Sequence, residues 1–295
     1  MIPIHRALLV AALLLAAPAL YAKNQVDALQ SQIDNLYQVA QAQRPATLVK
    51  LATDIRALPA GKAKVTLADS LASKASEGDP GLDALQAVAD TLTQALTESP
   101  VPAKKDWPPG PYFNLARLVR YEHVTTTLKD PMFAKAADTL VKNEADIDKV
   151  DFTLKDLQGK KVTFSQFRGK VVLVYFWVVP PDWCDACRQE TPVEMGDIDT
   201  IYTHLASQGL VVLSIDSEDV PVSDPMKIPE FVGKMRYHPT VLLDPGSKVA
   251  DLFHTDRGTP RSFVINREGK LVAVAINMRT QRQLLNMLAL AGIHP

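Results

Sequence analysis

The stretch VVLVYFWVVPPDWCDAC, residues 171–187, decides the fold of this 295-residue chain. Its first eight residues, Val171–Val178, form a nearly continuous run of β-branched and aromatic side chains, which predicts a strand covered on both faces. A helix is expected from about Ala186 to Ser207, directly after Trp183 and Cys184. The two cysteines, Cys184 and Cys187, therefore stand where a buried strand gives way to a helix.

The sequence on both sides of this stretch alternates between strand and helix patterns. Strands are expected at 151–154, 161–164, Leu210–Ile215, Thr240–Leu243, Arg261–Asn266 and Lys270–Ile276, and helices at Lys227–Met235 and Gln281–Leu290. Arg267-Glu268-Gly269 is a hairpin signal between the last two strands. This alternation predicts an α/β layered domain over residues 149–295.

Residues 23–106 are expected to form an all-α N-terminal domain. Apolar residues recur there at helical spacing, as in Val26, Leu29, Ile33, Leu36 and Val39. The run Trp107-Pro108-Pro109-Gly110-Pro111 cannot continue a helix, so a boundary is placed there. Residues 107–148 are then this Pro-rich boundary and two linking helices, Phe113–Leu128 and Pro131–Asn143. The helical region shows no catalytic cluster and is expected to serve packing or partner contact.

The first 22 residues have the pattern of a secretory signal peptide. Arg6 lies in a short basic region, residues 7–17 are an unbroken apolar run, and cleavage is expected after Ala19 or Ala22. The alternative is an uncleaved signal anchor that holds the protein at a membrane. In either case the rest of the chain is expected to be exported, to the periplasm or beyond, where a close pair of cysteines tends to oxidise.

Composition excludes several classes of protein. With 32 Lys+Arg and 33 Asp+Glu the net charge is -1, which gives no support to a nucleic-acid partner. Hydrophobic residues make up 47%, which rules out wholesale disorder. Only two cysteines are present, so a disulfide-stapled scaffold and a four-cysteine zinc or iron–sulfur site are excluded.

The spacing of the two cysteines points to disulfide exchange. Residues at i and i+3 lie on one helix face about 5–6 Å apart, the Cα separation that a disulfide requires. A helix N-terminus favours the thiolate of the first cysteine, so Cys184 is the expected nucleophile and Cys187 the resolving thiol. Asp182 and Asp185 place negative charge near Cys184 and oppose this effect. A thiolate without strong stabilisation fits a reductant better than a strong oxidant.

Motifs spread over residues 149–293 resemble a known family. They are DFTL at 151–154, FRGKVVLV at 167–174, WCDAC at 183–187, Glu190-Thr191-Pro192, LDPG at 243–246, Gly258-Thr259-Pro260 and FVINREG at 263–269. Together they are similar to the thioredoxin-like domain of the TlpA/ResA type of exported thiol–disulfide oxidoreductase, in the AhpC/TSA redoxin superfamily. The resemblance covers close to half of the chain.

The resemblance implies a thioredoxin-like fold and roles for four further residues. The Thr259–Pro260 peptide bond is expected to be cis, with Pro260 packed against the disulfide and Thr259 offering its backbone to an extended substrate. Glu190 is expected near the thiols as a catalytic proton carrier; the alternative is a solvated helix residue. Trp183 is expected to shape the docking face; the alternative is core packing.

The sequence departs from the family pattern at two places. The link between strand and WC motif, residues 178–182, is about three residues longer than usual in the family. Tyr175 stands where many thioredoxins have a buried Asp that manages protons, so that role would have to pass to another residue. These departures concern the surroundings of the cysteines and leave the cysteine pair itself intact.

Three other interpretations remain open. The CxxC motif can be half of a zinc site, although no further cysteines and no nearby His pair are present. A thiol peroxidase shares the broader fold, but Pro181 stands three residues before Cys184 where a peroxidase would have Thr. A partner-binding protein with a structural disulfide is the non-enzymatic alternative. The leading hypothesis has no cofactor or metal; its partners are protein dithiol or disulfide clients and an unidentified electron donor.

Overall fold

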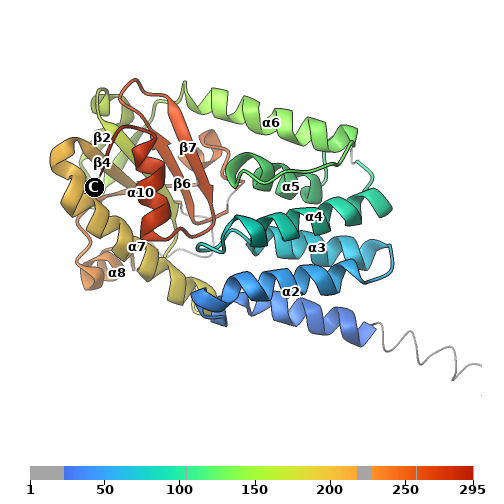
Figure 1. The fold of residues 1–295 in the computed structure, drawn as a ribbon. Helices are drawn as coiled ribbons and strands as arrows, with labels where there is room; N and C mark the ends of the chain where they lie inside the picture. Colours follow the sequence, from blue (N-terminus) through green and yellow to red (C-terminus); the bar gives the residue numbers. More distant parts are fainter. Residues whose placement is uncertain (1–22, 104, 218–226, 257, 295) are drawn as a thin grey trace, which may run out of the picture.

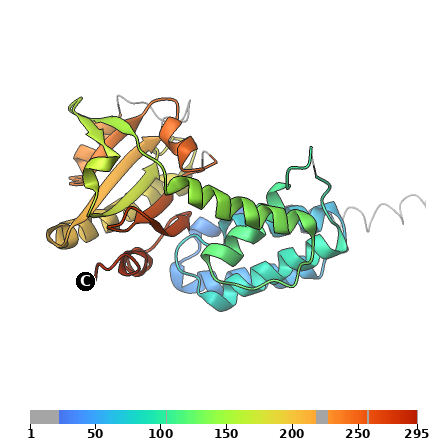
Figure 2. The ribbon, with the colours of Figure 1, turned by 90° about the horizontal axis from the view of Figure 1, so that it is seen from above.

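The computed structural model describes residues 23–103, 105–217, 227–256 and 258–294. Within these ranges the chain forms a helical part and an α/β part, which lie side by side (Figures 1 and 2). The predicted signal peptide, residues 1–22, lies outside the described residues. Among the described residues, no helix has both the length and the apolarity needed to cross a membrane.

Helices packed around one core make up the helical part. They are residues 23–34, α2 (Arg44–Arg56), α3 (Lys62–Lys74), α4 (Leu82–Glu98), α5 (Gly110–Tyr121) and α6 (Pro131–Ile147), with short 3-10 turns at Leu36–Gln38 and Gln41–Gln43. The buried core runs from Leu29 to Leu140. It therefore includes α5 and α6, which pack with the earlier helices.

Local signals explain where α5 ends and α6 begins. The side chain of Asp130 accepts a hydrogen bond from the N–H of Met132 (2.7 Å), and Pro131 is the first helical residue of α6. The expected extension of α5 to Leu128 is wrong, because the helix ends at Tyr121. His123 has a positive φ of 60°, and the β-branched run at 124–127 that follows disfavours helix.

The α/β part is built on a seven-stranded sheet of order β2-β1-β5-β4-β3-β6-β7. Its elements are β1 (Thr153–Asp156), β2 (Lys161–Thr163), β3 (Val171–Trp177), α7 (Asp185–Leu205), β4 (Leu210–Ser217), α8 (Ile228–Met235), β5 (Thr240–Asp244), α9 (Lys248–Leu252), β6 (Arg261–Ile265), β7 (Leu271–Ile276) and α10 (Gln281–Ala289), with 3-10 turns at Phe164–Phe167 and Ala206–Gln208. Strand β3 is parallel to β4 and antiparallel to β6, which pairs antiparallel with β7. The sheet therefore combines a β3-α7-β4 crossover with a β6-β7-α10 hairpin unit, and the predicted α/β layering is confirmed.

Strand β3 is buried along its whole length, as the apolar run at 171–178 predicts. Alternate residues such as Leu173 and Tyr175 share a core with Ile198 of α7. On the other face of the strand, Val174 and Phe176 share a core with Phe253, which follows α9. Because both faces are covered, the end of β3 is a rigid support for the loop that carries the cysteines.

Polar contacts join the helical and α/β parts. Arg279 follows β7 and is 4% exposed; it donates to the carbonyl oxygen of Ser76 (2.8 Å) and forms an ion pair with Glu122. The N–H of Gly78 donates to the carbonyl oxygen of Met278 (3.0 Å). Helix α6 runs from the helical part to the edge of the sheet in Figure 2. These contacts bring the loop after α3 close to the α/β part.

Candidate active site

The two cysteines form a disulfide at the first turn of α7. Cys184 is the N-cap residue of α7, and the Cα atoms of Cys184 and Cys187 lie 5.3 Å apart. The N–H of Cys187 donates to Sγ of Cys184 (3.2 Å). Both cysteines are half-buried. A backbone donor aimed at this sulfur, together with the helix N-terminus, favours a thiolate at Cys184 once the disulfide is opened.

The Thr259–Pro260 peptide bond is cis, as expected from the resemblance. Arg261, the next residue, begins β6 and pairs with Phe176, one residue before β3 ends. Pro260, which precedes β6, and the loop 178–184, which follows β3, therefore lie at the same end of these two paired strands. The fold therefore brings the cysteine pair and the cis-proline loop, far apart in sequence, to one end of the molecule.

Two exposed groups surround the cysteines. The side chain of Trp183 is 77% exposed, so the core-packing alternative is wrong and the indole faces solvent. Asp185 forms an ion pair with Arg188 on the same helix. This pairing offsets part of the negative charge that the sequence places next to Cys184, although an exposed pair contributes little.

Glu190 lies one helical turn after Cys187 and is joined to the helical part of the chain. Its carboxylate pairs with Arg44 (3.1 Å), and the two side chains are 17% and 9% exposed. The solvated-helix alternative for Glu190 is therefore wrong. The Arg44 guanidinium also donates to the carbonyl oxygens of Val39, Tyr37 and Glu77, which hold it in place. The first residue of α2 thus positions a carboxylate on the active-site helix.

A second carboxylate stands close to this ion pair. Burial and, to a smaller extent, the Glu190 carboxylate raise the pKa of Glu77 to about 7, while Lys74 and Arg44 act in the opposite direction. The Arg44 guanidinium therefore forms an ion pair with Glu190 and also lowers the pKa of Glu77 electrostatically. Glu77 can hold or release a proton near neutral pH within the same cluster as Glu190.

Glu194 is a fully buried acid on the active-site helix α7. Its carboxyl group accepts hydrogen bonds from the Tyr175 hydroxyl (3.0 Å) and from the N–H of Arg279 (2.8 Å). Burial raises its pKa to about 8, more than these hydrogen bonds lower it. Tyr175, which replaces the Asp of many thioredoxins, therefore contacts a carboxyl group brought in by α7.

Sequence reasoning missed Glu194 and Arg44 for different physical reasons. Glu194 follows Cys187 by seven residues and shares the buried helix stripe of Ile198 and Ile201, so its place in that stripe was the available signal. Arg44 lies 146 residues before Glu190, and no local pattern marks their pairing. Contacts of this kind follow from the docking of the two parts.

Comparison with known proteins finds similarity for the α/β part. Residues 148–274 match the model of the AhpC/TSA family. Thiol-disulfide oxidoreductase ResA of Bacillus subtilis (strain 168) is 28% identical over 134 residues, which are 45% of this chain and 68% of that protein. ResA of Bacillus anthracis is 27% identical over 45% of this chain and 70% of its own length. The chloroplastic Peroxiredoxin Q of Gentiana triflora is 31% identical over 133 residues, 43% of this chain and 56% of that protein.

Solved structures match the same half of the chain. A putative thiol:disulfide interchange protein DsbE from Chlorobium tepidum is 25% identical with a TM-score of 0.40, covering 48% of this chain and 93% of its own. A putative thioredoxin from Neisseria meningitidis is 24% identical with a TM-score of 0.41, covering 48% and 88%. The family match begins at residue 148, so the helical part lies outside it. Residues 148–274 thus match the AhpC/TSA family model on a thioredoxin-like fold, and over this region the chain is similar to proteins named thiol–disulfide oxidoreductases.

Proposed function

We propose that the protein is an exported thiol–disulfide oxidoreductase that reduces or exchanges disulfides in client proteins through Cys184 and Cys187. The observation that carries the proposal is the half-buried disulfide at the N-terminus of α7, near the end of the central strands where cis-Pro260 also lies. A disulfide that only stabilised the fold would gain nothing from this position. At this position a client can reach the cysteines, the helix N-terminus favours a thiolate at Cys184, and the loop of Thr259 and Pro260 lies nearby.

Exchange proceeds in two steps from the reduced protein. The Cys184 thiolate attacks one sulfur of a client disulfide, forms a mixed disulfide and releases the other client sulfur as a thiolate. Cys187, after losing its proton, attacks Sγ of Cys184 and releases the second client thiolate. The client gains two electrons, and the protein ends with the Cys184–Cys187 disulfide. An external dithiol donor returns the protein to the reduced form.

The surrounding residues have separate roles in this proposal. Glu190, one turn from Cys187, takes the proton of the resolving thiol, and Arg44 is a positioning residue that holds Glu190. The exposed Trp183 contacts the client, and Thr259 offers its backbone beside Pro260. The signal-peptide pattern of residues 1–22 supports export to the periplasm, either as a free protein or on an uncleaved anchor.

The organisation proposed from the sequence assigns 23–106 to a helical domain, 107–148 to a boundary with linking helices and 149–295 to the thioredoxin-like domain. The shared core from Leu29 to Leu140 favours treating 107–148 as the closing part of the helical domain. Because this domain supplies Arg44 to the active-site helix, we propose that it acts on the site as well as on partner choice.

Reduction of insulin disulfides, followed by turbidity with a dithiol donor present, tests the proposed function. The Cys184→Ser and Cys187→Ser variants are matched, because each removes one sulfur from the same turn. Cys184→Ser is expected to abolish the reaction, and Cys187→Ser to accumulate mixed disulfides. Full activity in Cys184→Ser would defeat the proposal. Cysteine-dependent peroxide consumption without insulin reduction would favour the peroxidase, and resistance of the disulfide to mild dithiols would favour a structural role.

A further inference from the structure

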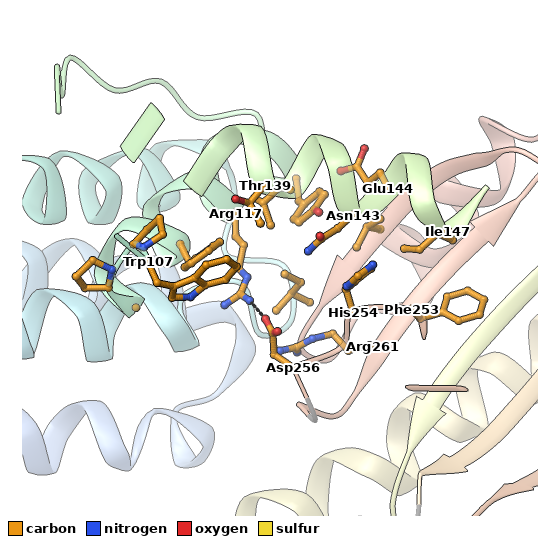
Figure 3. Close-up of a pocket in the computed structure, with 18 of the residues that line it drawn as sticks. Trp107, Arg117, Thr139, Asn143, Glu144, Ile147, Phe253, His254, Asp256 and Arg261 are labelled. Atoms are coloured by element: carbon orange, nitrogen blue, oxygen red, sulfur yellow. Dashed lines mark hydrogen bonds and ion pairs between the residues drawn. The ribbon is translucent and has the colours of Figure 1, made fainter. Parts of the chain in front are cut away.

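A cavity of about 590 Å³ lies between the helical domain and the thioredoxin-like domain. Figure 3 shows side chains from α5, α6, β6 and the segment after α9 around it. Its volume falls in the range of pockets that bind small organic ligands. Because both domains supply its walls, the cavity depends on the way they are docked.

Apolar and aromatic side chains form most of the wall. They include Trp107, Phe113, Leu140, Ile147, Phe253 and Phe263. The Trp107 ring packs against that of Phe113 in a tilted arrangement with a centroid distance of 5.5 Å, yet 58% of Trp107 is exposed. An apolar ligand in the cavity would cover this indole surface and gain the free energy of its desolvation.

Two guanidinium groups share one carboxylate at the cavity. Arg117 of α5 forms an ion pair with Asp256. Arg261 of β6 donates to the carbonyl oxygen of Pro260 (3.1 Å), and no ion pair joins it to a carboxylate of the described residues. Burial, with repulsion from Arg117, lowers the pKa of Arg261 to about 10, which leaves it charged at neutral pH. The two guanidinium groups thus have one carboxylate, Asp256, between them, which leaves an excess of one positive charge in a largely apolar cavity.

The other polar groups at the cavity do not compensate this charge. The Glu144 carboxylate is held by Arg120 through both oxygens. The Asn143 side chain is half-buried and has no hydrogen bond to another described residue. In Figure 3, Asn143, Arg117 and His254 lie around the same space from three different elements. The site therefore offers donors and a net positive charge to a ligand.

We propose that this cavity binds a small organic acid, whose apolar body lies against Trp107 and Phe113 and whose single carboxylate is held by Arg117 and Arg261. A carboxylate supplies the second anion that the two guanidinium groups lack, and Arg binds carboxylates with two parallel hydrogen bonds. A neutral ligand of the same shape leaves the excess positive charge of Arg117 and Arg261 uncompensated, and a cation is repelled. The proposal does not rest on dithiol exchange, although Arg261 also contacts the carbonyl group of cis-Pro260.

Calorimetric titration of the full chain in its disulfide form tests the charge preference. Three probes of matched shape are used: 4-phenylbutanoate, 4-phenylbutan-1-ol and 4-phenylbutan-1-amine. The acid is expected to bind about tenfold or more tightly than the alcohol, because hydrogen bonds to charged groups are the strong ones. The amine is expected to bind most weakly. Equal affinity for the acid and the alcohol, or no binding of the acid at millimolar concentration, would overturn the proposal.

Substitutions locate the site and fix the sign of the effect. Arg261→Gln is expected to lower the affinity for the acid about tenfold and to leave the affinity for the alcohol unchanged within twofold. Asp256→Asn is expected to raise the affinity for the acid, because the substitution removes the carboxylate that competes with the ligand for Arg117. Lys142→Gln, an exposed position on α6 outside the cavity, is the control with the same loss of charge. If Arg261→Gln fails to fold, the Asp256→Asn variant still tests the proposal, because its affinity for the acid should rise. Weaker or unchanged binding of the acid by Asp256→Asn would refute the proposal.

Discussion

Replacing Arg44 by methionine removes the cation that the helical domain supplies to Glu190, while most of the apolar stem remains. Arg44 is 7% exposed and has donors to three carbonyl oxygens besides the Glu190 carboxylate. Breaking a buried ion pair on one side costs about 3–5 kcal/mol, and an exposed pair contributes about 0.2–1 kcal/mol. Because 17% of the Glu190 side chain still reaches water, we expect a loss of about 3 kcal/mol in the free energy of unfolding.

A double-mutant cycle separates the ion pair from the other contacts of Arg44. The variants are Arg44→Met, Glu190→Gln and the two combined, and urea unfolding is followed by tryptophan fluorescence and by circular dichroism. The expected coupling energy is about 2 kcal/mol, between the values of exposed and buried pairs. Lys50 and Asp54, an exposed i,i+4 pair on α2, give a control cycle with an expected coupling of about 0.3–0.5 kcal/mol.

The result that would refute this reasoning is a coupling between Arg44 and Glu190 no larger than that of the control pair. Two domains can unfold separately, so coincidence of the two spectroscopic transitions is checked first. Arg44→Lys keeps the charge but not the planar array of donors, and is expected to lose less stability than Arg44→Met. Equal losses in the two variants would show that the charge of Arg44 contributes nothing.

Three further outcomes follow from the same structure. Glu194 has a pKa of about 8 in the folded protein and an ordinary value of 4.5, so between these two pH values the folded state holds a proton that the unfolded state has lost. Stability should therefore fall as pH rises through this window, by at most about 1.4 kcal/mol per pH unit, and urea midpoints of Glu194→Gln should lack this component. Trp183→Ala should change stability by less than about 0.5 kcal/mol, because the side chain is 77% exposed, and should slow reduction of insulin but not of a small disulfide. Arg279→Met should cost about 3–5 kcal/mol by thermal or urea unfolding, since it leaves the mostly buried Glu122 without its cation; a loss under about 1 kcal/mol would contradict the ion pair seen between the domains.

Elements with a strong repeating pattern could be predicted from the sequence. The buried run at 171–177 became the central strand β3, and the amphipathic segments became α7 and α10. Helix α9 was missed because five residues are too few to show a helical period. Its start depends on Asp244, whose carboxylate accepts the N–H groups of Val249 and Ala250, a contact visible only after folding.

The site could be predicted in part, for a related reason. The cysteine pair is local, so its place at a helix N-terminus followed from neighbouring residues, and the cis bond at Pro260 followed from family resemblance. The partners of Glu190 and Glu194 depend on docking between distant segments. Such contacts leave no periodic trace in either segment, which is why the pairing of Arg44 with Glu190 was not predicted.

Mass spectrometry of the two single-cysteine proteins tests the central claim most directly. Reduced Cys187→Ser and reduced Cys184→Ser are each mixed with the same disulfide-bonded peptide, and the mixed disulfide is followed over time. If the N–H of Cys187 and the start of α7 favour a thiolate at Cys184, the Cys187→Ser protein forms its adduct several-fold faster. An adduct that forms as fast or faster on Cys187, or on neither cysteine, would contradict the account.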